Sequence, residues 1–540
     1  MLFAVALSLE SPTLATGWAA LILLGVGLIE SGLVLQELLT RFDSSRLMQL
    51  VAAESLAMIH KRGGMEPNSV IAAAQPILDL IVRGAQNDDV AIVGHGMAAW
   101  RRLFAEYIKA KGQLFYSDLY IDWLFARAQE LIEIYGRRSS GIVLPKLIAG
   151  TVDLGVTAAH HRQAYNEGIN EGVYFSNRCL EAAVATSVGA HLSPAAGQAI
   201  VGITAIGTAL LDASKVNTAG ETIRSLRSLG RALSDDPYLA HWVSSGLADM
   251  VLNLGERFPD ALMAEPHAEE AADAIIAISQ ADRTGKLGPT HFLTAPMAER
   301  SLPRLVYTTA RAGGRRNRRE GWTTWDSICA KFGHFTFTIP ARPDVDTMVR
   351  INAANCCGGI LQALLAAPHR EPTLRTFRDL GSDFIALIAT GDAERLHLVD
   401  VAEEVMLSAY YASTDPEATN DCLGFLDDFA KGALGWDQAT QRRFGPAFRR
   451  VGAAAIVRAD HDTARTMALA SVPRSQRTGK GIYVPEDDFD LDGFAPFNQL
   501  QRPGVPEPNR GTDHLNREAQ DDFLELERQL HPRAHQTPEE

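Results

Sequence analysis

One segment near the start of the chain has a residue spacing that could do chemistry. An apolar run leads into Gly94, Gly96 and Ala99, which have the GxGxxA spacing of a dinucleotide-binding turn. Such glycines let a pyrophosphate approach a helix N-terminus, and Asp118 or Asp122 would then bind the ribose. The competing interpretation is one amphipathic helix, because large apolar residues keep a helical period straight through the glycines. We favour the helix and keep a nucleotide-binding enzyme as an alternative function.

A basic run in the middle of the chain precedes two tryptophans, Trp322 and Trp325. Arginine forks and tryptophan faces can hold phosphates or anionic lipid headgroups, so a binder of anionic lipid or nucleic acid is a further alternative. The candidate contacts are Arg315, Arg316, Arg318 and Arg319. A basic surface loop without a ligand explains the run equally simply, and we favour that interpretation.

Three other sets of reactive side chains lack the spacing of a known site. They are His160, His161, Glu167 and Glu171; the adjacent Cys356 and Cys357; and Asp460, His461 and Asp462. The first set has no HExxH or paired ExxH spacing, and adjacent cysteines point to different faces of a helix. The third set lacks a nucleophile nearby in the sequence. We therefore expect no metal, no cofactor and no catalytic residue, and an enzyme is less expected than a non-enzyme.

Composition sets broad limits on the chain. It has 540 residues, 46% of them hydrophobic, which is enough for two or more domains with their own cores. A formal charge of −14 argues against a surface built to bind polyphosphate, so nucleic acid is an unexpected partner. The five cysteines are sparse and form no CxxC pair, which favours free thiols in a reducing compartment.

The N-terminal segment is long and apolar enough to span a bilayer. Residues 11–29 carry no charge, and large aliphatic side chains continue to residue 39. Their insertion contributes about −4 to −7 kcal/mol, against about +2.5 to +3.5 kcal/mol for one central acid, here Glu30. Arg41 and Arg46 follow the segment, and no basic residue precedes it. We expect a single-pass anchor in the inner or plasma membrane, with the N-terminus outside and the bulk of the chain cytoplasmic.

The polar residues of this segment fall on one helical face. Gly27, Glu30 and Ser31 would lie together, away from lipid, so this face needs a protein neighbour. We expect the anchor helix to self-associate through it. The alternatives are packing against the chain's own helices, an ion path through Glu30, and a buried helix of a soluble protein.

A second uncharged stretch covers residues 182–211 and is interrupted only by His191. It restarts at Ser193 and Pro194, an N-cap followed by proline in the first helical turn. Small residues dominate it, so its insertion free energy is near zero. We expect a tightly packed core helix here and keep a second membrane segment as the alternative.

Helical signals dominate the rest of the chain. Large apolar residues recur three and four positions apart in residues 374–388 and 396–411. Asp236 and Asp415 each precede a proline, which predicts helix starts at these places. The one clear strand signal is the alternation in residues 334–340. We expect an all-α protein with an irregular multi-helix body, which could be solenoid-like although no fixed repeat period is present.

The composition changes near residue 471 to a sequence rich in proline and polar residues, which predicts a disordered tail. Four apolar residues lie among acids near its end: Phe523, Leu524, Leu526 and Leu530. They could form a short acidic helix on contact with a partner, and the alternative is a solvated tail.

These signals divide the chain into five segments. They are a membrane-anchor helix (1–45), a helical domain (46–290), a connector with the basic loop and the strand-like stretch (291–345), a second helical domain (346–470) and the acidic, proline-rich tail (471–540). The function that fits best is a membrane-anchored helical interaction or assembly protein. Its cytosolic body would bind a protein partner, and its anchor helix would self-associate.

Overall fold

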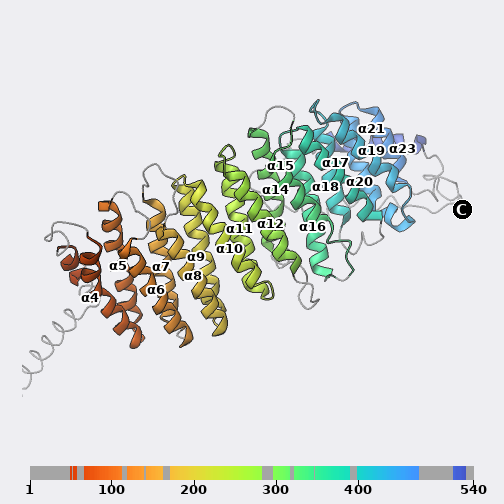
Figure 1. The fold of residues 1–540 in the computed structure, drawn as a ribbon. Helices are drawn as coiled ribbons and strands as arrows, with labels where there is room; N and C mark the ends of the chain where they lie inside the picture. Colours follow the sequence, from red (N-terminus) through yellow and green to blue (C-terminus); the bar gives the residue numbers. More distant parts are fainter. Residues whose placement is uncertain are drawn as a thin grey trace, which may run out of the picture. The chain divides into compact units, whose positions relative to one another are not determined.

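The structure, a computed structural model, describes most of the chain between residues 49 and 530. The described residues are 49–51, 53–57, 66–111, 118–138, 141–161, 171–281, 296–316, 321–343, 345, 347–389, 398–472 and 515–530. Within these ranges all regular secondary structure is helical and no strand occurs (Figure 1). The all-α prediction is confirmed. The expected anchor, with Gly27, Glu30 and Ser31, lies outside the described residues.

The chain forms two compact units, residues 1–209 and 210–540. The helices of the first unit are α4 (Pro67–Gln86), α5 (Val90–Lys111), α6 (Leu119–Arg137), α7 (Leu144–His160) and α8 (Glu171–Gly189). Helix α9 (Ser193–Asp212) begins in this unit and ends in the second. Helices α4, α6 and α8 pack on one another in one row, and α5 packs on α7 in the other.

The second unit repeats this pattern with more helices. They are α10 (Val216–Ala232), α11 (Pro237–Arg257), α12 (Ala264–Ala281), α14 (Pro296–Arg316), α15 (Thr324–Phe337), α16 (Thr347–Ala366), α17 (Glu371–Ala389), α18 (Leu398–Ala412), α19 (Thr419–Ala433), α20 (Gln438–Val457), α21 (His461–Ser471) and α23 (Leu515–Leu530). One row runs α11, α14, α16, α18, α20 and α23; the other runs α10, α12, α15, α17, α19 and α21. Each helix thus packs on the next helix of its own row, and pairs such as α14 and α15 pack across the rows, which is the packing of an α-solenoid.

Helix α9 is the part of the second uncharged stretch that could cross a membrane. Among the described helices it alone is long and apolar enough to do so, and 67% of its most apolar stretch is buried within the protein. Ile200, Ile203 and Ile206 are fully buried there. This burial fits the core helix that we expected.

The two predicted helix starts have different outcomes. Asp236 caps α11, since its Oδ1 accepts a hydrogen bond from the Leu239 amide at 3.1 Å and Pro237 follows in the first turn. Asp415 does not start a helix, because α19 begins only at Thr419. Its carboxylate accepts from the Glu417 amide within a turn, so the aspartate and proline mark the turn that precedes the helix.

The predicted strand at residues 334–340 is wrong, because residues 334–337 form the last turn of α15. A capping box between Thr323 and Asp326 starts this helix. Phe335 and Phe337 lie on different faces, yet both are only 7% exposed. Since α12, α14, α16 and α17 all pack on α15, apolar residues are favoured on several of its faces and produce an alternating pattern.

The prediction of a disordered tail is wrong for residues 515–530, which form α23. This helix packs on α20 and α21, and Phe523 is 1% exposed. The predicted acidic helix therefore forms by contact within the same chain. Residues 473–514 lie outside the described parts.

Candidate interaction edge

The segment with the dinucleotide-like spacing is the interior of a helix. Helix α5 runs unbroken from Val90 to Lys111, through Gly94, Gly96 and Ala99, and the element directly before it is helix α4. A dinucleotide-binding turn requires a strand, a turn and then a helix, whereas the residues around Gly94 form one helix. The dinucleotide-binding interpretation is therefore wrong. Asp118 instead caps α6 by accepting from the amides of the first turn. The helical spacing of the large apolar residues was therefore the correct signal, although Gly94 and Gly96 lie in the helix interior.

Gly94 provides a direct test of this assignment. No atom lies within 4 Å of the position that a Cβ would take, so Gly94→Ala should raise the free energy of unfolding by about 0.5–1 kcal/mol, through helix propensity alone. Chemical denaturation measures this change. Gly150→Ala, which would overlap Met97 in the same unit, is the matched control and should destabilise. A loss of stability in Gly94→Ala would contradict the helical assignment.

The second unit has one edge formed by the loops that end its helix pairs. Its described residues are 258–263, 321–323, 367–370, 413–418 and 458–460, and we call it the loop edge. Contacts made by these loops, with each other and with the first turn of α15, show that they are neighbours. The Trp325 indole donates to the Pro259 carbonyl at 3.2 Å, and His369 bonds Asp415 at 2.8 Å. The bond from His369 lowers the pKa of the Asp415 carboxyl.

The first two arginines of the basic run are part of α14 and contact its neighbours. Arg315 donates to the Glu256 carbonyl at 3.1 Å, at the end of α11. Arg316 pairs with Glu265 of α12 at 2.6 Å. The loop predicted for this run is therefore wrong up to Arg316, where the chain is helical; Arg318 and Arg319 lie outside the described residues. Arg315 and Arg316 thus connect α14 to α11 and α12.

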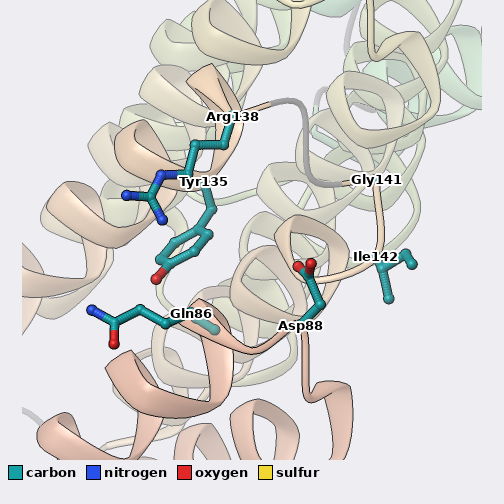
Figure 2. A pocket seen from close by; sticks show the side chains of 7 residues that line it. Gln86, Asp88, Tyr135, Arg138, Gly141 and Ile142 are labelled. Atoms are coloured by element: carbon teal, nitrogen blue, oxygen red, sulfur yellow. The ribbon is translucent and has the colours of Figure 1, made fainter.

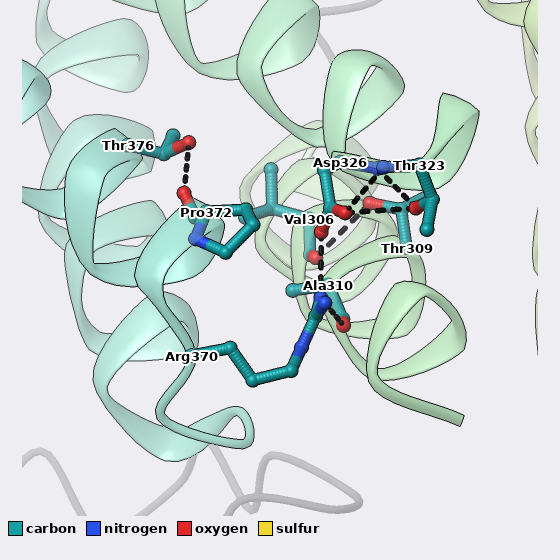
Figure 3. A network of polar contacts seen from close by, with 8 residues as sticks. All are labelled: Val306, Thr309, Ala310, Thr323, Asp326, Arg370, Pro372 and Thr376. Carbon is teal, nitrogen blue, oxygen red and sulfur yellow. Dashed lines mark hydrogen bonds and ion pairs between the residues drawn. The ribbon is translucent and has the colours of Figure 1, made fainter. Parts of the chain in front are cut away.

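A largely buried ion pair connects the loop edge to α15 (Figure 3). Asp326 of α15 and Arg370, just before α17, are 2.6 Å apart, with side chains 2% and 15% exposed. Arg370 also donates to the Ala310 carbonyl of α14 at 3.3 Å. The second Asp326 oxygen accepts from the amide and hydroxyl of Thr323 at 2.9 and 2.8 Å. This pair joins α14 and α15 to the start of α17.

The glycine at position 313 makes room for this ion pair. A Cβ at Gly313 would lie 2.7 Å from Asp326 Oδ1 and 2.8 Å from Arg370 Nη2. Gly313 therefore allows α14 to pack closely on this charged pair. It lies just before the basic run whose arginines the sequence suggested as phosphate contacts. Cys329 lies in the same buried region, where burial, with a contribution from the Asp326 charge, raises its pKa to about 12. That thiol stays protonated at neutral pH.

Arginines lie over aromatic rings at three places along the loop edge. Arg257 lies 5.4 Å from the Phe258 ring, and Arg375 lies 6.0 Å from the Trp322 ring. Arg458 lies over two rings, Tyr410 at 5.1 Å and Tyr411 at 4.7 Å. Trp322 is 49% exposed and Tyr411 43%. Exposed tryptophan, tyrosine and arginine are the residue types enriched in protein interfaces.

The first unit has a separate polar hollow of about 320 Å³, beside the turn that joins α4 and α5 (Figure 2). Arg138 lies 5.4 Å from the Tyr135 ring, and the Tyr135 hydroxyl donates to the Val82 carbonyl at 3.5 Å. Burial raises the pKa of Tyr135, and the Arg138 charge lowers it in part. The hollow is open to solvent, and its lining includes the acidic Asp88 and the basic Arg138.

The remaining sets of reactive side chains are not brought together as sites in the described part of the chain. All five cysteines are buried and none forms a disulfide; Cys356 and Cys357 are both in α16. Asp460 caps α21 by accepting from the Thr463 amide at 3.1 Å. No group of three His, Cys, Asp or Glu side chains with metal-binding geometry occurs among the described residues, and Glu167 lies outside them.

The sequence interpretation missed the Asp326 and Arg370 pair. The threonine and aspartate of the capping box, three residues apart at 323 and 326, were a readable signal for the helix start. No local pattern points to Arg370, because it meets Asp326 through the packing of helices distant in sequence.

Comparison with protein-family models gives no match, and comparison with curated proteins gives none either. Among solved structures, the chain is similar to a "Circular tandem repeat protein with novel repeat topology and enhanced subunit contact surfaces". The identity is 11%, the TM-score is 0.36, and the match covers 79% of this chain and 94% of that one. A similarity of this size assigns neither a family nor a function.

Proposed function

We propose that the chain is a membrane-anchored helical scaffold whose stacked helices bind a protein partner. The observation that supports this most is the packing of the second unit, in which the helices form two rows and the loops that join helices across the rows form the loop edge. Stacked-helix proteins use such extended surfaces for binding. The exposed arginine and aromatic pairs of the loop edge supply the residue types that dominate binding energy.

The membrane anchor in this proposal rests on the sequence of residues 1–45. We expect the full chain to stay with membranes during alkaline extraction, because insertion of its aliphatic residues outweighs the burial of Glu30. The chain without residues 1–45 should move to the supernatant. Fractionation followed by immunoblotting measures both. Release of the full chain at alkaline pH would contradict an integral anchor.

Self-association through the anchor can be tested with two matched glycine variants. Gly27 lies on the expected polar face with Glu30, and Gly25 lies about 160° away on an ideal helix. Gly27→Leu should reduce chemical cross-linking between copies in membranes, since small residues allow close helix approach. Gly25→Leu should leave cross-linking unchanged. Equal behaviour of the two variants would contradict an interface on this face.

A further inference from the structure

The C-terminal helix α23 covers one end of the second unit's stack, where it packs on α20 and α21 (Figure 1). Two of its described side chains are buried, Phe523 and Glu527. They lie four residues apart and therefore on one face of the helix. Leu524 and Leu526 are half-buried, and the remaining described side chains are exposed. Among the described side chains, the contacts of α23 thus centre on one ring and one carboxylate.

The ring of Phe523 occupies a space created by Gly452 of α20. A Cβ at Gly452 would overlap the Phe523 ring, with its Cε2, Cδ2 and Cζ atoms as nearest neighbours. Glycine weakens the interior of a helix, so its presence here is explained by the ring that it admits.

Glu527 is bound by a set of donors that fits a carboxylate. Its side chain is fully buried, and Arg449 donates to it in bidentate fashion, Nε to Oε2 and Nη2 to Oε1, each at 3.0 Å. The hydroxyl of Ser471 donates to Oε1 at 3.0 Å. Arginine forks bind carboxylates with strong geometric preference. The surface of α20 and α21 therefore recognises an aromatic residue followed four positions later by a glutamate.

We propose that this surface is a receptor site for an acidic amphipathic helix of a partner protein, and that α23 is the internal ligand which such a helix displaces. Residues 473–514 separate α23 from α21, whereas residues 458–460 suffice to join α20 to α21. Since only two of its described side chains are buried, we expect α23 to open at a lower free energy than the stack that it covers. The inference deepens the proposed function, because it names one binding site of the scaffold.

Charge defines the kind of partner. Helix α23 carries five acids, Glu518, Asp521, Asp522, Glu525 and Glu527, against two arginines, Arg517 and Arg528. Helix α20 carries four arginines, Arg442, Arg443, Arg449 and Arg450, and no acid. Of these, Arg449 pairs with Glu527, and Arg450 pairs with Glu403 of α18. Helix α21 adds one acid, Asp462, and one arginine, Arg465. Complementary charge of this kind speeds association and excludes basic helices. The partner helix should therefore be acidic and contain the spacing of Phe523 and Glu527.

Peptide exchange in the full chain tests the proposal. A protease site is placed within residues 473–514, and a fluorescent peptide of residues 512–533 is titrated before and after cleavage. The peptide should bind the cleaved chain, and at least about tenfold more weakly the uncut chain, because the tethered α23 competes at a high effective concentration. Peptides with Phe523→Ala or Glu527→Gln should each bind at least about tenfold more weakly than the parent peptide.

Two alanine variants separate site loss from unfolding. Gly452→Ala fills the space of the ring and should abolish peptide binding, while helix α20 gains propensity. Gly424→Ala, where no atom lies within 4 Å of the new Cβ, should bind the peptide normally. The proposal is overturned if the peptide never enters the cleaved chain, if Gly452→Ala binds it normally, or if a scrambled peptide of equal charge binds equally well. This experiment does not depend on membrane attachment. A negative result would therefore contradict the receptor site and leave the membrane anchor untouched.

Discussion

Replacement of Asp326 by alanine should lower the free energy of unfolding of the second unit by about 3–5 kcal/mol. The reason is that the guanidinium of Arg370 would lose its partner. Arg370 is 15% exposed and pairs with Asp326 at 2.6 Å, so removal of the carboxylate strands a buried charge. The variant also loses the capping box at the start of α15. Chemical denaturation followed by circular dichroism measures the change.

Two further variants separate the charge from the cap. Asp326→Asn keeps an oxygen for the Thr323 amide and hydroxyl but removes the charge, so it should destabilise less than alanine. The double variant Asp326→Ala with Arg370→Met should recover part of the loss, because no buried charge remains unpaired. If the loss of unfolding free energy in the double variant equals the sum of the losses in Asp326→Ala and Arg370→Met, the two residues are not coupled in the folded protein.

The fold class was predictable from the sequence because helical periodicity is a local property. The period through Gly94 and the cap at Asp236 both identified helices that the structure contains. Errors arose where tertiary contacts change the local pattern. The phenylalanines near the end of α15 alternate because helices cover several of its faces, and α23 is ordered because Gly452 admits Phe523.

The candidate edge was less predictable than the fold. The sequence placed arginines next to tryptophans at residues 315–325, and this suggested one ligand-binding surface. The structure divides that set by contacts and burial. Arg315 and Arg316 are exposed but bond to neighbouring helices, whereas Trp325 is fully buried and Trp322 is exposed. Burial depends on which helices pack together, and a single sequence without related sequences contains little information about that.

The two tryptophans test this division, and the second large effect is expected at Trp325. Its side chain is fully buried, and its indole donates to the Pro259 carbonyl at 3.2 Å, so Trp325→Ala should lower the free energy of unfolding by about 3–5 kcal/mol. Trp322 is 49% exposed, so Trp322→Ala should change stability by no more than about 0.5 kcal/mol. Chemical denaturation of both variants gives the comparison. Equal losses would mean that Trp322 is also part of the core, and the loop edge would then lose its most exposed aromatic side chain as a binding residue.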